Sequence, residues 1–213
     1  MRLLSIIAAL LILSGAAADA QSITRAQGFI THAAFFSLET KQANLLDPEV
    51  FVADPSAAAA TGPQGITHVA GVRPAFGVDD PETKLETAQG KPLGFTLGQW
   101  FGARGRVTLS AAPGGGTAMT YVMTGLVPNG VYSFFENHFA ADGVTFTPLD
   151  GTAQHNTFTA TARGTAGGSL SIPGTVTHSE GILLVYHSDG MAHDMDRGQI
   201  GVNVHHQLII RIP

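Results

Sequence analysis

Alternation of apolar and polar residues, beginning after Gly105 and recurring to the end of the chain, is the feature that most limits the fold. Val107 and Leu109 alternate with polar neighbours, and six later segments are apolar or alternating in the same short runs. A period of two places every second side chain on one face of a β-strand. The expected strands, separated by turns rich in glycine, proline or aspartate, are residues 106–111, 119–124, 131–139, 158–162, 169–172, 182–186 and 204–212.

The spacing of these strands predicts an all-β fold, an antiparallel β-sandwich of the Greek-key type. No helix-length pattern lies between the strands, so the parallel crossovers of an α/β fold are not expected. A short helix is expected before the first strand, because Thr96 and Gln99 have capping-box spacing and Gly102 can end the helix. Trp100, within this helix, is expected to fill the core rather than to stack on a sugar.

The amino terminus has the organisation of a secretory signal peptide. Arg2 supplies a positive start, residues 3–13 are almost entirely apolar, and Ala18 and Ala20 form an A-x-A cleavage pattern. The apolar run is shorter than the roughly 20 residues of a membrane-spanning helix. We therefore expect cleavage before Gln21 and export to the periplasm or the extracellular space, with no membrane segment in the mature protein.

The chain is expected to have three regions: a signal peptide at residues 1–20, a proline-rich extension at 21–92 and the sandwich domain at 93–213. The extension holds six of the eleven prolines and shows weak periodicity, so it is expected to be loosely structured. A segment that binds a partner is its functional alternative.

Composition excludes several classes of function. The chain has no cysteine, which removes disulfides, thiolate metal ligands and cysteine nucleophiles. It has 11 lysines and arginines against 16 aspartates and glutamates, a formal charge of −5. Nucleic acid is therefore not an expected partner, because binding to it depends on a basic surface. The oligomeric state is left open.

Glu136 and His138 are the first candidate metal ligands. In the strand at residues 131–139, alternation puts them on one face together with Tyr132 and Phe134. Such a pair can hold a metal ion or orient a water molecule. A hydrogen bond between the two side chains is the structural alternative.

The densest polar cluster follows the strand at residues 182–186. His187, Asp189 and His193, with Asp194 and Asp196 beyond them, place five potential ligands within ten positions. The alternative is a network in which the aspartates bond to loop amides. The cluster lacks the remaining ligands of a calcium loop, so calcium is not expected.

The two adjacent histidines of the last expected strand lie on opposite faces of it. His206 shares the apolar row and is expected to be buried or at the rim, whereas His205 shares its face with Gln207 and Arg211 and is the better candidate ligand. His155 begins another strand and could join from the same end. The remaining histidines, His32, His68 and His178, lie in weakly patterned stretches and are expected at the surface.

The sequence therefore predicts one metal site at one end of the sandwich. Three imidazoles and one carboxylate suit zinc or copper(II). The predicted ligands are Glu136, His138, His187 and His205, with Asp189 or His193 as a loop ligand or an orienting residue. A hydrogen-bonded cluster without metal is the alternative.

Four motifs carry a resemblance to other proteins: Leu-Gly-Gln-Trp at 97–100, Gly-Leu-Val-Pro-Asn-Gly-Val-Tyr at 125–132, Tyr-His-Ser-Asp-Gly at 186–190 and His-His-Gln-Leu at 205–208. Over about residues 95–213 the chain resembles a group of exported bacterial β-sandwich proteins of uncharacterised function. This resemblance implies a fold and an export route.

The chain also resembles copper/zinc superoxide dismutases. The turn at residues 125–130 is similar to one in that family, which implies that Glu136 and His138 stand where two ligand histidines would be and that His187 stands on the later ligand strand. The chain departs from the family in lacking the cysteine pair and the zinc loop. Glu136 also replaces a nitrogen donor with oxygen, which disfavours copper redox cycling.

Binding rather than turnover is the expected function. The sequence contains no Gly-x-Ser-x-Gly elbow, no His-Glu-x-x-His pair and no phosphate loop. Two alternatives remain: a metalloenzyme, redox or hydrolytic, whose ligands meet only in the fold, and a structural or adhesion module without metal.

Overall fold

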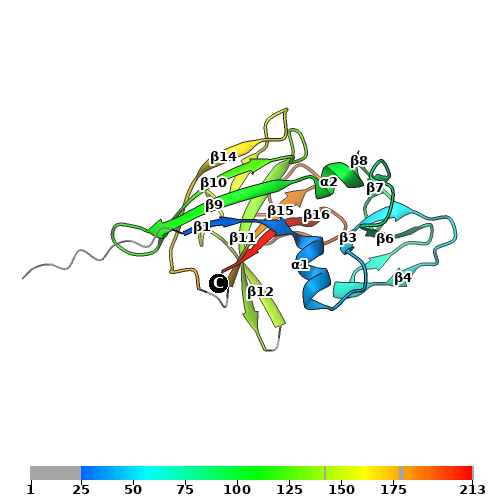
Figure 1. Cartoon of the computed structure of the whole chain (residues 1–213), viewed down its shortest axis with the longest axis horizontal. Helices are drawn as coiled ribbons and strands as arrows, with labels where there is room; N and C mark the ends of the chain where they lie inside the picture. Colours follow the sequence, from blue (N-terminus) through cyan, green and yellow to red (C-terminus); the bar gives the residue numbers. More distant parts are fainter. Residues whose placement is uncertain (1–24, 142, 178–179, 213) are drawn as a thin grey trace, which may run out of the picture.

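The alternating segments form antiparallel strands that pack as two facing sheets. The computed structural model describes residues 25–141, 143–177 and 180–212, and most of its regular structure is strand. The predicted all-β sandwich is confirmed (Figure 1). The predicted signal peptide and His178 lie outside the described residues.

One sandwich sheet has four strands in the order β1-β9-β10-β14. Its strands are β1 (Arg25–Gly28), β9 (Arg104–Ala111), β10 (Thr117–Thr124) and β14 (Ala166–Ile172). The facing sheet has the order β12-β11-β15-β16-β2, and β13 also pairs with β11. Its strands are β12 (Gly143–Pro148), β11 (Val131–Ala140), β15 (Glu180–His187), β16 (Val204–Arg211), β2 (Ile30–Thr31) and β13 (Thr157–Thr159). The chain crosses between the sheets from β10 to β11, from β13 to β14 and from β14 to β15, as Greek-key connections do.

The two faces of β11 have the roles that alternation predicted. Tyr132 and Phe134 lie in the core between the sheets, whereas Phe135 and Phe139 belong to a second apolar cluster on the opposite face. This opposite, outer face of the sheet is covered by α1 (His32–Glu39), which contacts β16.

A third sheet stands at one end of the sandwich, where the sequence predicted a loose extension (Figure 1). Its order is β6-β3-β7-β8, and a short two-stranded ribbon lies beside it. The bounds are β3 (Leu46–Ala53), β6 (Val72–Phe76), β7 (Lys84–Glu86) and β8 (Pro92–Thr96), with β4 (Ala60–Thr61) and β5 (Thr67–His68) in the ribbon and a 3-10 turn at Pro63–Gly65 between them.

The expectation of loose structure was wrong for the described part of residues 21–92. Pro48 lies inside β3 where the register shifts between Asp47 and Phe51, and Pro74 lies on the edge strand β6. Proline is tolerated at bulges and edges of a sheet, because no ladder hydrogen bond is lost there. Proline content therefore concealed a strand whose residues 46–52 are all buried.

The predicted helix before β9 is confirmed as α2 (Leu97–Phe101). Thr96 N donates to Gln99 Oε1 at 2.9 Å and Gln99 N donates to Thr96 Oγ1 at 3.3 Å, which completes the capping box. Trp100 is 1% exposed, and its Nε1 donates to Asp47 Oδ2 at 2.8 Å. Trp100 thus fills the core and also anchors β3. None of the helices in the described ranges is long and apolar enough to cross a membrane.

Replacing Trp100 with Phe should weaken this anchor. The buried carboxylate of Asp47 loses its indole donor and a small void opens, so the free energy of unfolding should fall by about 2–4 kcal/mol. Urea unfolding followed by circular dichroism measures the loss. The change Phe101→Leu, on the same helix but without such a bond, is the control. An unchanged stability of the Trp100→Phe protein would show that the bond does not support the fold.

Candidate metal centre

A buried carboxylate, Glu49, lies where three parts of the fold meet. It belongs to β3, and its side chain reaches His32 at the start of α1 and His206 on β16. Glu49 Oε1 is 3.5 Å from His32 Nδ1 and 2.8 Å from His206 Nδ1, and the side chains are 0%, 6% and 3% exposed respectively. These three residues can hold a metal ion. We call them the Glu49 cluster.

Two potential ligand atoms of the Glu49 cluster have no hydrogen-bond partner within residues 25–141, 143–177 and 180–212. Glu49 Oε1 and His32 Nδ1 are buried without one, even though His206 Nδ1 is 2.8 Å from Oε1. The contact is short, but its angles are not those of a hydrogen bond. Buried polar atoms are almost always hydrogen-bonded, so two adjacent exceptions require an explanation. One ligand atom of each residue in the cluster lies within 4.8 Å of the others, so a shared cation could satisfy the unpartnered atoms.

The separations also suit a single ion. Two ligands bound at 2.0–2.1 Å in tetrahedral geometry lie about 3.3 Å apart. The observed 2.8 Å and 3.5 Å lie on either side of that value. Small side-chain rotations would therefore bring both histidines and the carboxylate to one metal.

The backbone holds Glu49 in this position. Its Oε2 accepts the backbone N–H of His206 at 2.6 Å, and its carbonyl oxygen accepts the Nδ1–H of His205 at 2.8 Å. On the α1 side, Leu46 N donates to Ser37 Oγ at 2.9 Å. These bonds tie β3 to β16 and to α1, so the three potential ligands come from rigid elements.

Arg197 contacts the cluster from the loop between β15 and β16. Its Nη1 lies 2.8 Å from His206 Nε2, and its guanidinium stacks 3.1 Å from the centre of the Phe146 ring. Arginine has no acceptor, so Nε2 must accept this bond. The proton of the neutral His206 ring is therefore on Nδ1, which lies 2.8 Å from Glu49 Oε1 but outside hydrogen-bond geometry.

Both histidines of the cluster line a cavity of ≈ 470 Å³ on the outer face of the sheet. Glu49 is absent from its lining and lies behind the two rings. The cavity is walled by α1, β11, β12 and the loop of Arg197, and its volume is within the range of small-molecule sites. A metal held by the cluster would therefore have an open side toward this cavity.

Burial determines the protonation of the cluster. It lowers the pKa of His32 to about 4 and the pKa of His206 well below its usual 6.5. Burial raises the pKa of Glu49, although His32, the backbone N–H of His206, Arg197 and the side chain of Gln64 oppose that change. Burial, and then the charge of Glu49, raise the pKa of Asp47 to about 7. Neutral imidazoles are the form that binds metal.

The predicted ligands Glu136 and His138 form a different group. Together with Glu180, they can also hold a metal ion. His138 Nε2 lies 3.8 Å from Glu136 Oε2, and its Nδ1 lies 3.9 Å from Glu180 Oε1. These side chains are only partly buried, and His138 Nε2 is also 2.9 Å from Thr147 Oγ1. This group is the more solvated of the two.

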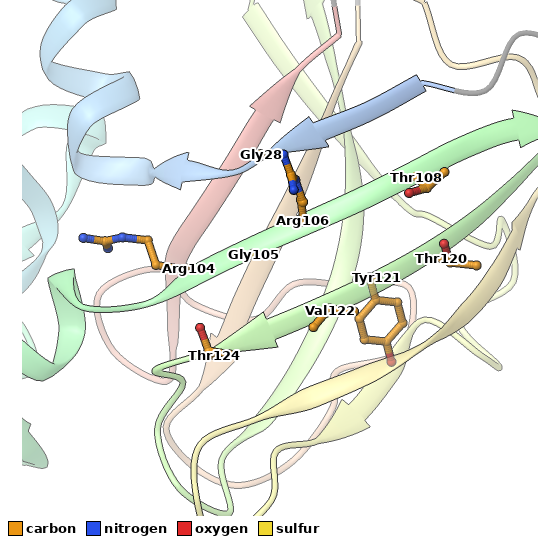
Figure 2. A pocket seen from close by; sticks show the side chains of 9 residues that line it. All are labelled: Gly28, Arg104, Gly105, Arg106, Thr108, Thr120, Tyr121, Val122 and Thr124. Carbon is orange, nitrogen blue, oxygen red and sulfur yellow. The ribbon is translucent and has the colours of Figure 1, made fainter.

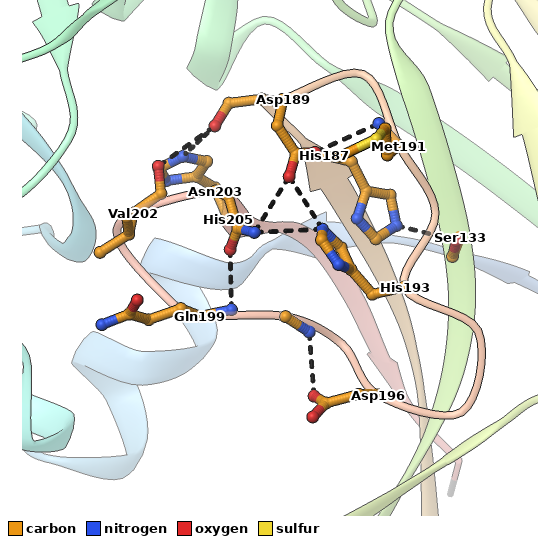
Figure 3. Close-up of polar contacts among 12 residues, drawn as sticks. Ser133, His187, Asp189, Met191, His193, Asp196, Gln199, Val202, Asn203 and His205 are labelled. Carbon is orange, nitrogen blue, oxygen red and sulfur yellow. Dashed lines mark hydrogen bonds and ion pairs between the residues drawn. The ribbon is translucent and has the colours of Figure 1, made fainter.

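The predicted loop ligands are held by hydrogen bonds, as the alternative interpretation proposed. Figure 3 shows Asp189 contacting His193 and Asn203, with Asp189 Oδ2 at 3.0 Å from each partner atom. Asp189 Oδ1 accepts from Met191 N at 3.1 Å. His187 Nε2 lies 2.8 Å from Ser133 Oγ, while its Nδ1 is buried without a partner.

His205 is fully engaged and does not offer a free nitrogen. Its Nδ1 donates to the carbonyl of Glu49, so its Nε2 accepts from Ser188 Oγ at 3.2 Å. Its ring also packs against Trp100 and Tyr186 in the core. The role of His205 is to connect β16 with β3.

The expected convergence of Glu136, His138, His187 and His205 was wrong. Strands β11 and β15 are antiparallel, with His187 opposite Val131 and His138 opposite Glu180. Seven strand positions therefore separate the two histidines, roughly 23 Å at 3.3 Å per residue. The prediction placed the carboxyl ends of β11 and β15 at the same end of the sheet, which holds for parallel strands and not for this antiparallel pair. The same pairing separates the ligand set that the dismutase resemblance implied.

Sequence reasoning missed the Glu49 cluster. His32 was expected at the surface but is buried, as is His68; only His206 was correctly expected to be buried. His155 is exposed and does not join a cluster. One signal was available: Glu49 precedes the apolar run 50–52. A carboxylate within a buried strand needs a partner.

A second hollow lies over β1, β9 and β10, on the other sheet (Figure 2). Its volume is ≈ 420 Å³, and Arg104 and Arg106 stand beside it. Arg104 Nη1 already donates to the carbonyls of Phe101 and Ala103. No buried polar atom without a partner lines this hollow in the described residues, so it does not compete with the Glu49 cluster.

The fold and the site define a class: a β-sandwich protein with buried His/Glu groups that can hold a metal ion. No protein family, curated protein or solved structure matches the chain.

The buried histidines make the metal-free protein sensitive to acid. Burial lowers the pKa of His32, His187 and His205 from 6.5 to about 4, so the unfolded chain binds more protons than the folded one between these values. Stability therefore falls as the pH falls from 6.5 to 4. Asp47, Glu49 and Glu136, whose pKa values are raised, act in the opposite direction. With His206 included, four histidines outweigh three carboxylates.

Urea unfolding of chelator-treated protein at several pH values measures this effect. The change His187→Gln can keep a contact with Ser133 and should reduce the slope by about one proton between pH 6.5 and 4. Stability that rises as the pH is lowered through this window would contradict the assignment of neutral buried histidines.

Proposed function

We propose that this protein binds one divalent transition-metal ion, zinc or copper(II), through His32, Glu49 and His206. The observation that supports the proposal is a pair of buried atoms, Glu49 Oε1 and His32 Nδ1, that have no hydrogen-bond partner in the described part of the chain and lie within 4.8 Å of a ligand atom of His206. The sequence predicted a His/carboxylate metal site at one end of the sandwich. The site proposed here lies instead on the outer face of the sheet that contains β15 and β16.

The donor set favours zinc. Two imidazoles and one carboxylate are a known three-ligand set for this ion, which then keeps a fourth position for water or another ligand. Here the fourth position faces the cavity, because both histidines line it. Copper(II) also accepts nitrogen and oxygen ligands and generally binds such sites more tightly. Calcium and magnesium prefer oxygen ligands alone.

Metal binding requires one rearrangement. A metal on His206 Nδ1 takes the lone pair of that atom, so the ring proton moves to Nε2. Arg197 Nη1, now 2.8 Å from Nε2, would then face another donor and has to move away. In the metal-free protein Arg197 is thus the cation that partly balances the buried charge of Glu49.

Calorimetric titration of the chelator-treated protein with Zn²⁺ and Cu²⁺ at pH 7 tests the proposal. We expect one site per chain in the wild type and loss of that site on Glu49→Gln. This substitution retains the shape of the side chain and removes a buried charge, so it should not unfold the protein. Circular dichroism checks the fold.

Glu136→Gln is the matched control, because it makes the same change in the other carboxylate–histidine group. It should leave the tight site intact. His32→Asn supplies a second, independent variant if Glu49→Gln alters the fold. Binding that survives both changes in the Glu49 cluster but is lost with Glu136→Gln would assign the metal to the Glu136 group. The absence of any binding by the wild type would refute the proposal.

We also propose that the protein acts outside the cytoplasm, as the amino-terminal pattern predicts. The proposed metal site uses only histidine and glutamate ligands, so an exported protein can form it without cysteine ligands or disulfides. The resemblance to exported β-sandwich proteins of uncharacterised function agrees with that location.

Export makes a direct prediction about the mature chain. When the full-length protein is expressed in a bacterium with a periplasm, the product in the periplasmic fraction should begin at Gln21, as measured by amino-terminal sequencing and intact mass. Ala18→Lys and Ala20→Lys together should block processing, because the cleavage site requires small residues. A cytoplasmic product that retains Met1 would contradict export.

A further inference from the structure

Arg197 has donor capacity that the fold does not use. Its only hydrogen bond in the described residues is the one from Nη1 to His206, and it forms no ion pair with a carboxylate there. Its five N–H donors therefore remain largely unpartnered, although the side chain is partly buried and stacked on Phe146. These unpartnered N–H groups can bind an anion that comes from outside the protein.

Asn137 presents a second free polar group to the same cavity. It lies on the outer face of β11, lines the cavity, and its Oδ1 is buried without a partner. Its side chain forms no hydrogen bond with any other described residue. Because an amide both donates and accepts, Asn137 can contact either a charged oxygen or a hydroxyl group.

Most of the other wall residues are apolar or aromatic; the exceptions are Gln64 and Glu39, and the carboxylate of Glu39 is paired with Arg211 at 3.1 Å. Phe35 and Phe36 approach from α1, Phe139 from β11, and Val144 and Phe146 from β12. The rings of Phe35 and Phe139 pack in a tilted arrangement, with centroids 5.8 Å apart. A cavity with apolar walls and a few convergent polar groups is the usual form of a small-molecule site.

We propose that this cavity binds a small organic carboxylate with a flat apolar group, its carboxylate on Arg197 and its apolar part among the phenylalanines. The planar guanidinium matches a carboxylate in bidentate fashion. A phosphate dianion fits less well, because one arginine and one amide supply few donors and most of the wall is apolar. An organic cation is disfavoured as the ligand of this cavity, because Arg197 itself is positively charged.

The coupling of this ligand to the metal rests on the proposed function. In the metal-free protein Arg197 donates to His206, and the charge of Glu49 lies behind that ring. Metal on the cluster would neutralise Glu49 and release Arg197 from His206. The carboxylate should therefore bind more tightly to the metal-loaded protein, and by linkage the metal should bind more tightly in its presence.

Benzoate is the probe, and benzamide is its neutral counterpart of almost equal shape. Calorimetry and chemical-shift titration at pH 7 should show benzoate binding at least tenfold tighter than benzamide, with shifts at Asn137 and Phe139. The measurement is made first on chelator-treated protein and then with Zn²⁺ present, where a further gain in benzoate affinity is expected. Equal affinity for benzoate and benzamide would overturn the proposal.

Arg197→Gln separates the two ligands. It should weaken benzoate binding at least tenfold, yet it should strengthen Zn²⁺ binding because a competing cation is removed from His206. Arg104→Gln, at the other hollow, is the control and should change neither. Unchanged benzoate affinity in the Arg197→Gln protein, or no benzoate binding to the wild type in either state, would also overturn the proposal.

The two proposals can fail independently. If the carboxylate site is correct and the metal site is not, benzoate binds to Arg197 with or without Zn²⁺, and the calorimeter detects no tight Zn²⁺ site. If only the metal site is correct, Zn²⁺ binds through Glu49 and benzoate behaves like benzamide. Glu49→Gln distinguishes these cases further, since it should abolish Zn²⁺ binding and leave the benzoate contact with Arg197 in place.

Discussion

The buried carboxylate of Glu49 is the group around which the outer face of this protein is organised. It accepts the backbone N–H of His206 and reaches His32, so it joins β3, β16 and α1 in one contact. Burying a carboxylate is costly unless it is compensated. The compensation here is incomplete, because one oxygen lacks a hydrogen-bond partner among the residues that the structure describes. That deficit is what a bound cation would remove.

The rest of the junction supports this arrangement. Asp47, two residues before Glu49, accepts the indole of Trp100 and fixes β3 against the sandwich core. His205 and His206 are neighbours with different tasks: the first ties β16 to the β3 backbone, and the second faces the cavity. The third sheet therefore brings the Glu49 carboxylate to His32 on α1 and His206 on β16. The site requires that this sheet be ordered.

Local patterns predicted local structure well. The capping box at Thr96 and the core role of Trp100 are both confirmed. The predicted strand segments lie in strands of the structure, apart from residue 212 and all but the first two residues of segment 158–162. The hairpin strand β12 and the whole of β3 were missed. In β3 the reason is physical: Pro48 is acceptable at a bulge, and the adjacent carboxylates made a buried strand look like a polar loop.

The amino-acid sequence by itself determined the all-β class, the faces of β11 and the absence of thiolate chemistry, because each follows from residue type and a period of two. Tertiary structure alone decided which ligands meet. Antiparallel pairing places His138 and His187 at opposite ends of their strands. The same fold brings Glu49 to His206, 157 positions away. Contacts of that kind depend on strand order and register between distant segments, which no local pattern encodes.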